Sequence, residues 1–98
     1  MTATGYLAQY FGERLINIDH PVGTNFSEIS TLGAHNLVDD TPLLIQYVEG
    51  ISNINGLVFR IKVTGPSTFT IPLIPIGSYV RGGTYFNAYM ANHYIPEL

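Results

Sequence analysis

The chain has 98 residues, of which 46% are hydrophobic, so we expect one folded domain around one core rather than a disordered polypeptide. It contains no cysteine, which excludes disulfides and thiolate metal sites. It also lacks an apolar run of the roughly 18–20 residues that a membrane span needs, so we expect a soluble, unexported protein without a membrane partner. The net charge is −3, and four scattered basic residues are too few for the roughly six to ten phosphates of a typical nucleic-acid site, so we expect no nucleic-acid partner.

Residues 1–25 are expected to form an N-terminal arm. Leu7, Phe11 and Leu15 follow one another at intervals of four, a spacing that would place them on one face of a helix. Two glycines within this segment weaken that interpretation, and the alternative is an extended arm that docks onto a neighbouring subunit. Both interpretations remain open, and turn chemistry follows at residues 19–23.

Residues 26–83 are expected to form a β-barrel that begins with strands over residues 26–34 and 43–48. The register of the first strand is poorly fixed, whereas the second is rich in residues that favour strands. Asn55-Gly56 is the favoured dipeptide for a turn with positive φ, so the chain is expected to reverse direction there.

The stretch Leu57–Thr64 has the clearest alternation. Its odd-numbered positions are all large and apolar, whereas its even-numbered positions include Arg60 and Lys62. This pattern predicts one half-buried antiparallel strand with its charges facing outward. After a turn at residues 65–67, Thr68–Ile71 is expected to run back as the next strand.

The last part of the expected barrel contains residues that interrupt strands. Pro72 and Pro75 cannot donate backbone hydrogen bonds, so the chain between them is expected at a sheet edge or outside the sheet. A short strand over residues 78–81 would then end at Gly82-Gly83, and residues 84–98 would form a C-terminal arm, either strand or short helix. The expected fold class is mainly β, a small antiparallel β-barrel or sandwich with less regular N- and C-terminal arms, in one compact domain.

Short motifs from about residue 29 to residue 83 resemble a known module in their order and spacing. They are Ala34-His35-Asn36-Leu37, Asp39-Asp40, Leu43–Val48, Gly50, Ile54-Asn55-Gly56, Val58–Val63, Ser67-Thr68-Phe69-Thr70-Ile71, Tyr79 and Gly82-Gly83. The series resembles the FCCH-like domain, a small β-barrel named after the first catalytic-cysteine half-domain of ubiquitin-activating enzymes. That family usually has His-Gly-Leu and a Gly-Asp turn where this chain has Asn36 and Asp39, and Asn and Asp tolerate the same bends.

The resemblance implies a structural role, because the module recurs in bacteriophage virion proteins. It brings no enzyme chemistry with it, since this chain has neither a cysteine nor a nucleotide-binding loop. The function it implies is that of a virion structural protein, made in the host cytoplasm. The small length of the chain favours a capsid decoration or cement subunit within this class. A neck or tail component and a glycan- or receptor-binding module are the alternatives.

A shortage of charge also points to contact with other proteins. Four basic and seven acidic residues make 11 charged side chains, where an ordinary domain of this size carries about 25. Large neutral areas of this kind usually become interfaces, unless the tyrosines already fill the core. Tyrosine suits an interface because it combines apolar area with a hydroxyl group. The expected partners are the major capsid protein, other virion proteins and further copies in a homo-oligomer, and the expected contact residues are Tyr6, Tyr10, Phe11, Tyr85, Phe86 and Tyr89.

The sequence shows no pattern of residues typical of catalysis or of a metal or cofactor site. His20, His35 and His93 lack ligand spacing, so a structural role is expected for each. In the family pattern His35 lies at a turn where its ring caps backbone groups. Asp39-Asp40 offers too few oxygens for the roughly six to eight ligands of Ca²⁺ and is expected to be a solvated turn that caps the following strand. We therefore expect no enzyme, no metal and no cofactor.

Overall fold

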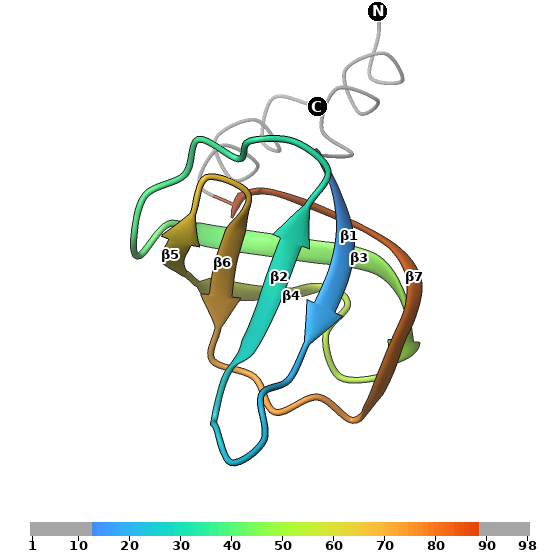
Figure 1. The fold of residues 1–98 in the computed structure, drawn as a ribbon. Helices are drawn as coiled ribbons and strands as arrows, with labels where there is room; N and C mark the ends of the chain where they lie inside the picture. Colours follow the sequence, from blue (N-terminus) through green and yellow to red (C-terminus); the bar gives the residue numbers. More distant parts are fainter. Residues whose placement is uncertain (1–12, 89–98) are drawn as a thin grey trace, which may run out of the picture.

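A computed structural model of the chain describes residues 13–88, which form seven strands joined in antiparallel pairs (Figure 1). The strands close into a nearly complete barrel, so the prediction of a small antiparallel β-barrel is confirmed. The strands are β1 (Glu13–Asp19), β2 (Ser27–Thr31), β3 (Pro42–Ile51), β4 (Leu57–Arg60), β5 (Lys62–Gly65), β6 (Thr68–Ile71) and β7 (Gly77–Asn87).

A single residue joins the two ends of the sheet. The strand order is β4-β3-β7-β1-β2-β6-β5, so β4 and β5 are the two edge strands, although only Ile61 separates them in the chain. The carbonyl of Ile61 accepts a hydrogen bond from the N–H of Asp40 at 2.8 Å, and its N–H donates to the carbonyl of Thr41 at 3.3 Å. Its side chain is fully buried. The chain therefore turns a corner at Ile61, and β3 and β4 cross behind β5 and β6 in Figure 1.

This corner corrects the prediction of one strand over Leu57–Thr64. β4 pairs with β3, whereas β5 pairs with β6 on the opposite side of the barrel. The alternation of apolar residues continues through the corner because Ile61 still points into the core. The pattern therefore identified the inward face from Phe59 to Val63, although Leu57 is 48% exposed, and it did not reveal the change of partner strand.

The core is formed by inward side chains from the strands and from the β3–β4 turn. Phe69 of β6 is fully buried, and its ring lies edge-to-face against Tyr85 at 5.7 Å between ring centroids. Phe69 and Ile71 are both buried, which confirms the predicted strand Thr68–Ile71 and its alternation. The core cluster consists of Leu15, Ile18, Ile29, Leu43, Ile45, Val48, Ile51, Ile54, Ile61, Phe69, Ile71 and Tyr85.

Part of the expected N-terminal arm belongs to the barrel. β1 lies between β2 and β7 and pairs with both, so residues 13–19 are strand and not helix. Leu15 and Ile18 are both buried although they are three residues apart. The register of β1 against β2 shifts between Leu15 and Asn17, and such a bulge allows residues at helical spacing to face the same side of a strand. Leu7 and Phe11 lie outside the described residues.

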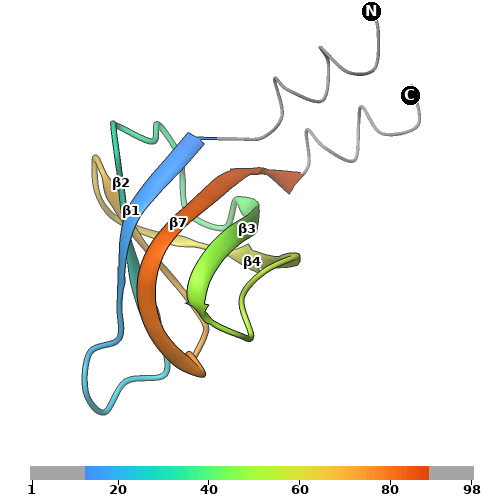
Figure 2. The ribbon, with the colours of Figure 1, turned by 90° about the vertical axis from the view of Figure 1, so that its right-hand side faces the viewer.

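The pair Gly82-Gly83 bends a strand and does not end it. β7 continues through both glycines, whose φ angles are 79° and 108°, and includes residues 84–87 of the expected C-terminal arm. A Cβ atom on Gly83 would lie 2.8 Å from side-chain atoms of Leu15 and Val48. Tyr47 in the facing part of β3 also has a positive φ, 65°. β3 and β7 therefore bend at the same level and curve side by side around the core (Figure 2).

Candidate protein-interaction surface

The outside of the barrel exposes many large apolar side chains. Among the described residues one ion pair is present, Arg81–Glu49 at 3.1 Å, and both partners are exposed, so it contributes little to stability. Beside its charged residues, the exterior of this part of the chain therefore exposes apolar surface that is available for contact. The exposed large apolar residues are Ile16, Val22, Phe26, Leu32, Val38, Tyr47, Leu57, Val58, Ile74, Ile76 and Val80.

Three neighbouring strands carry a continuous apolar row on the outer face of the barrel. In β3, Leu44 lies between two fully buried residues, so its side chain faces outward. Leu44 is directly opposite Val58 of β4 on one side and Phe86 of β7 on the other. Val58 is exposed, and Leu44 and Phe86 are half-buried. We call Val58, Leu44 and Phe86 the outer row.

The structure describes two of the six predicted contact residues. Phe86 lies in the outer row, on the face where a contact residue is expected. Its neighbour Tyr85 faces the other way and is only 3% exposed, which is the position of a core residue and not of a contact residue. The remaining four fall outside the described residues 13–88: Tyr6, Tyr10, Phe11 and Tyr89.

The sequence analysis missed Leu44 and Val58. The prediction assigned Val58 to a polar outward face with Arg60 and Lys62, and it gave Leu44 no separate role. A signal was present nevertheless, because residues 43–45 and 57–59 are consecutive apolar triplets. A strand with one wet face alternates apolar and polar residues, so an unbroken triplet indicates that the outward face is apolar as well.

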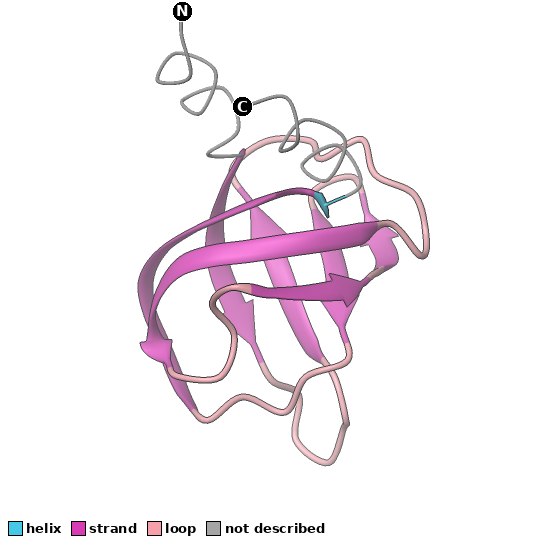
Figure 3. Ribbon diagram, turned by 180° about the vertical axis from the view of Figure 1, so that it is seen from behind, coloured by secondary structure: helices cyan, strands magenta, loops and turns pink. Residues whose placement is uncertain are grey.

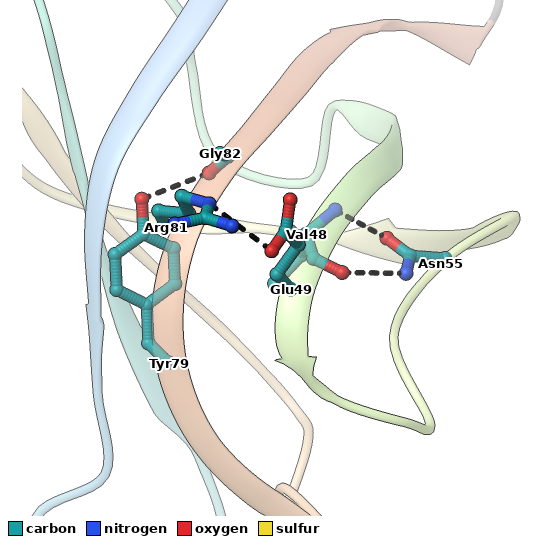
Figure 4. A network of polar contacts seen from close by, with 6 residues as sticks. All are labelled: Val48, Glu49, Asn55, Tyr79, Arg81 and Gly82. Carbon is teal, nitrogen blue, oxygen red and sulfur yellow. Dashed lines mark hydrogen bonds and ion pairs between the residues drawn. The ribbon is translucent and has the colours of Figure 1, made fainter.

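Where β1 and β7 separate, a tyrosine side chain of β7 makes a hydrogen bond to its own strand. The two strands pair at Glu13–Tyr85 and Arg14–Thr84 and then separate. The hydroxyl of Tyr79 donates a hydrogen bond to the carbonyl of Gly82 at 2.8 Å, and Figure 4 shows its ring between the two ribbons. Burial raises the pKa of the Tyr79 phenol, and the Arg14 charge partly offsets this rise.

The separation leaves an open hollow beside Tyr79, with a volume of about 390 Å³. Asp19 and His20 contribute polar groups to its lining, and Ile18 and Ile51 contribute apolar surface. The Nδ1 atom of His20 lies 2.9 Å from the carbonyl of Phe26, so this ring nitrogen is engaged with the β1–β2 connection. The ring therefore supports the turn, in agreement with the structural role expected for it.

His35 holds two loops together, which confirms its expected structural role. Its Nδ1 accepts a hydrogen bond from the N–H of Leu37 at 3.0 Å, so the ring proton lies on Nε2. Nε2 faces the carbonyls of Gly65 at 2.7 Å and Thr68 at 3.0 Å. Both ring nitrogens are thus used, and the ring lies edge-to-face against Phe69 at 5.6 Å between centroids.

The acidic pair Asp39-Asp40 is a turn that supports the corner of the barrel. The Oδ1 atom of Asp39 accepts a hydrogen bond from the N–H of Val63 at 2.7 Å, so it caps β5 and not the strand that follows it directly. The carbonyl of Asp40 accepts a hydrogen bond from Nη1 of Arg60 at 2.9 Å. Within residues 13–88 no three His, Asp or Glu side chains are grouped as metal ligands.

Comparison with known protein families finds none that matches the chain, and comparison with curated proteins finds no relative. The resemblance to the FCCH-like domain therefore stays a prediction from the motifs. The described residues contain no helix that is long and apolar enough to cross a membrane.

Proposed function

We propose that the protein is a structural assembly subunit, which acts by packing its neutral outer surface against other protein subunits. The observation that carries this proposal is the outer row, where Val58, Leu44 and Phe86 form apolar surface across three strands on the outside of the barrel. Covering apolar surface contributes about 25 cal/mol per Å², so such a row favours contact with another protein over contact with water.

The role that we propose within this class is a component of a virion, most specifically a capsid decoration subunit. Its support is the series of motifs that resembles the FCCH-like module of bacteriophage virion proteins, together with the barrel fold that this resemblance implies. The charge-poor exterior also suits a subunit present in many copies, because neighbouring copies meet little like-charge repulsion. A neck or tail position would use the same surface.

The test is to purify particles from a lysate of the source culture on a density gradient and to measure the chain in each fraction by quantitative mass spectrometry. The proposal predicts that the chain sediments with the particles at a fixed, multiple copy number. It is overturned if the chain stays in the soluble fractions while the major capsid protein sediments.

A pair of variants tests the surface itself. Leu44→Gln places in the outer row the residue type that already occupies Gln46, which is two residues away and faces the same side of β3. We expect this variant to fold and to incorporate less than the wild type. Val22→Gln, at a fully exposed turn position, is the control and should incorporate normally. Equal incorporation of both variants would rule out the outer row as the contact.

A further inference from the structure

The edge strand β4 has features that natural edge strands usually avoid. Among the described residues it pairs only with β3, and no strand lies on its other side (Figure 3). Leu57 is 48% exposed and Val58 is 53% exposed, and Phe59 is half-buried. Edge strands are normally protected from pairing with other chains by shortness, charged residues, proline or bulges. β4 is short, with four residues, but it contains no proline and carries one charge, Arg60, at its very end.

We propose that β4 pairs with β4 of a second copy of this chain, in antiparallel orientation about a two-fold axis at Val58. This pairing rests in part on the proposed function and makes it more specific, because it names a second copy of the chain as one of the partners. A two-fold contact uses the same surface on both copies, so the surface must be complementary to itself. Among the registers that pair three residues of β4, only the one with its axis at Val58 opposes apolar residues alone.

In that register every pair in which both residues belong to β4 is apolar, and Arg60 lies opposite Gly56 of the partner subunit, just outside its β4. Val58 lies opposite Val58 of the partner subunit on the outer face, and Leu57 lies opposite the partner subunit's Phe59 on the other face. Neighbouring residues of a strand alternate between the two faces of a sheet. The register must therefore keep Val58 of both copies on the same, outer face of the combined sheet. An axis at Phe59 also does so, but it places Val58 opposite the charged Arg60 of the partner subunit.

The charges select the same register. With the axis at Val58 the two Arg60 residues are four positions apart along the paired strands, or about 13 Å at the rise of a β-strand. This separation of the two backbone positions exceeds the Debye length of about 8–10 Å in physiological salt, so repulsion between the two Arg60 charges is weakened in this register. With the axis at Phe59 they are two positions apart, at about 7 Å, and repel.

The pairing also continues the surface that the proposed function uses. Val58 ends the outer row, so the rows of the two copies join into one apolar band across the dimer. A four-residue edge buries less than the about 1,200–2,000 Å² of a stable complex. The dimer is therefore concentration-dependent and is favoured where copies are held side by side on an assembly.

The absence of cysteine from the chain allows a direct test by disulfide trapping. Opposed residues of antiparallel strands have Cα atoms about 4.5–5.5 Å apart, within the range of about 4.4–6.8 Å that a disulfide spans. Val58→Cys should therefore form a covalent dimer under mild oxidation. Val80→Cys is the matched control, because Val80 is also a strand valine and is 62% exposed. We expect the Val58 variant to cross-link about tenfold faster or more, since the pairing raises the effective concentration of its thiol.

Equal cross-linking rates for the two cysteine variants would overturn the proposal. A second measurement is sedimentation velocity of Val58→Lys and Val80→Lys over a range of concentrations, after circular dichroism has shown that both fold. Only Val58→Lys should abolish the concentration-dependent dimer, and a dimer that persists in it also contradicts the proposed edge. These results are separate from particle incorporation: a chain that cross-links through residue 58 but never sediments with particles disproves the proposed function alone.

Discussion

The side-chain amide of Asn55 holds both backbone groups of Val48, accepting its N–H at 2.8 Å and donating to its carbonyl at 2.9 Å (Figure 4). β4 pairs with β3 only over residues 42–45, so beyond Ile45 this side of β3 has no neighbouring strand among the described residues. Asn55 lies in the turn between the two strands and supplies the missing ladder bonds with its side chain. The bend of β3 at Tyr47 thus keeps a hydrogen-bonded backbone at Val48.

Replacing Asn55 should therefore destabilise the barrel. Asn55→Ala removes both hydrogen bonds and leaves two partly buried backbone groups unsatisfied, for which we expect a loss of about 2 kcal/mol in the free energy of unfolding. Asn55→Asp keeps the acceptor but loses the donor to the carbonyl of Val48, so its free energy of unfolding should also be lower than that of the wild type. Urea denaturation measures the difference. Asn25→Ala, at an exposed position, is the control and should change stability by less than about 0.5 kcal/mol.

The imidazole of His35 connects two loops and the core, and its removal should lower the free energy of unfolding more than Asn55→Ala does. His35→Ala loses three hydrogen-bond contacts and the packing against Phe69, so we expect a loss of about 3 kcal/mol in the free energy of unfolding. His20→Ala removes one exposed contact, with the carbonyl of Phe26, and should lose less than about 1 kcal/mol. Thermal and urea unfolding of the two variants provide the comparison. Equal losses would show that His35 does not hold the loops together.

A methyl group at Gly83 should be incompatible with the bend of β7. The φ of 108° is unfavourable for any residue with a Cβ, and the added atom would lie 2.8 Å from side-chain atoms of Leu15 and Val48. We expect Gly83→Ala to lower the free energy of unfolding by about 3 kcal/mol or more. Gly33→Ala is the matched control, because a Cβ there meets nothing within 4 Å, and it should be neutral within about 0.5 kcal/mol. Similar stability of both variants, measured by urea denaturation, would show that the bend does not require glycine.

The phenol of Tyr85 should make the barrel less stable in alkali. Burial raises its pKa above the ordinary value of 10.0, the hydrogen bond with Thr31 lowers the pKa in part, and the Glu13 carboxylate raises it further. As the pH rises past 10.0, the unfolded chain loses this proton first, and ionisation then favours unfolding. The stability linked to Tyr85 is thus complete below that pH and is lost as the pH approaches the higher pKa of the folded state.

Tyr85→Phe removes this titration, so its free energy of unfolding should fall less than that of the wild type between about pH 9 and pH 11. Urea denaturation at each pH measures how the free energy of unfolding of the two proteins changes with pH. The pKa of Tyr79 is raised as well, so the free energy of unfolding of Tyr85→Phe should still fall with pH, although less steeply than that of the wild type. Adding Tyr79→Phe should reduce this fall further. Parallel curves for the wild type and Tyr85→Phe would contradict the prediction.

The candidate surface could be predicted only in part. Phe86 was predicted to be a contact residue and lies in the outer row, whereas Tyr85 was predicted with it and lies in the core. Two adjacent aromatic residues in a strand must face opposite sides, but the sequence does not say which of them faces inward. That choice follows from the pairing of β7 with β1 and β3, which brings Tyr85 over Phe69.

The sequence by itself determined the properties that depend on neighbouring residues. Alternation over Thr68–Ile71 identified a strand and its buried face, and Asn55-Gly56 identified a turn. Only the tertiary structure decided which strands pair. Ile61 belongs to an unbroken alternating pattern, and Gly82-Gly83 is as compatible with the end of a strand as with a bend. The physical reason is that side-chain periodicity records the face that a residue presents to the core, whereas ladder partners come from distant segments whose backbone groups are chemically alike.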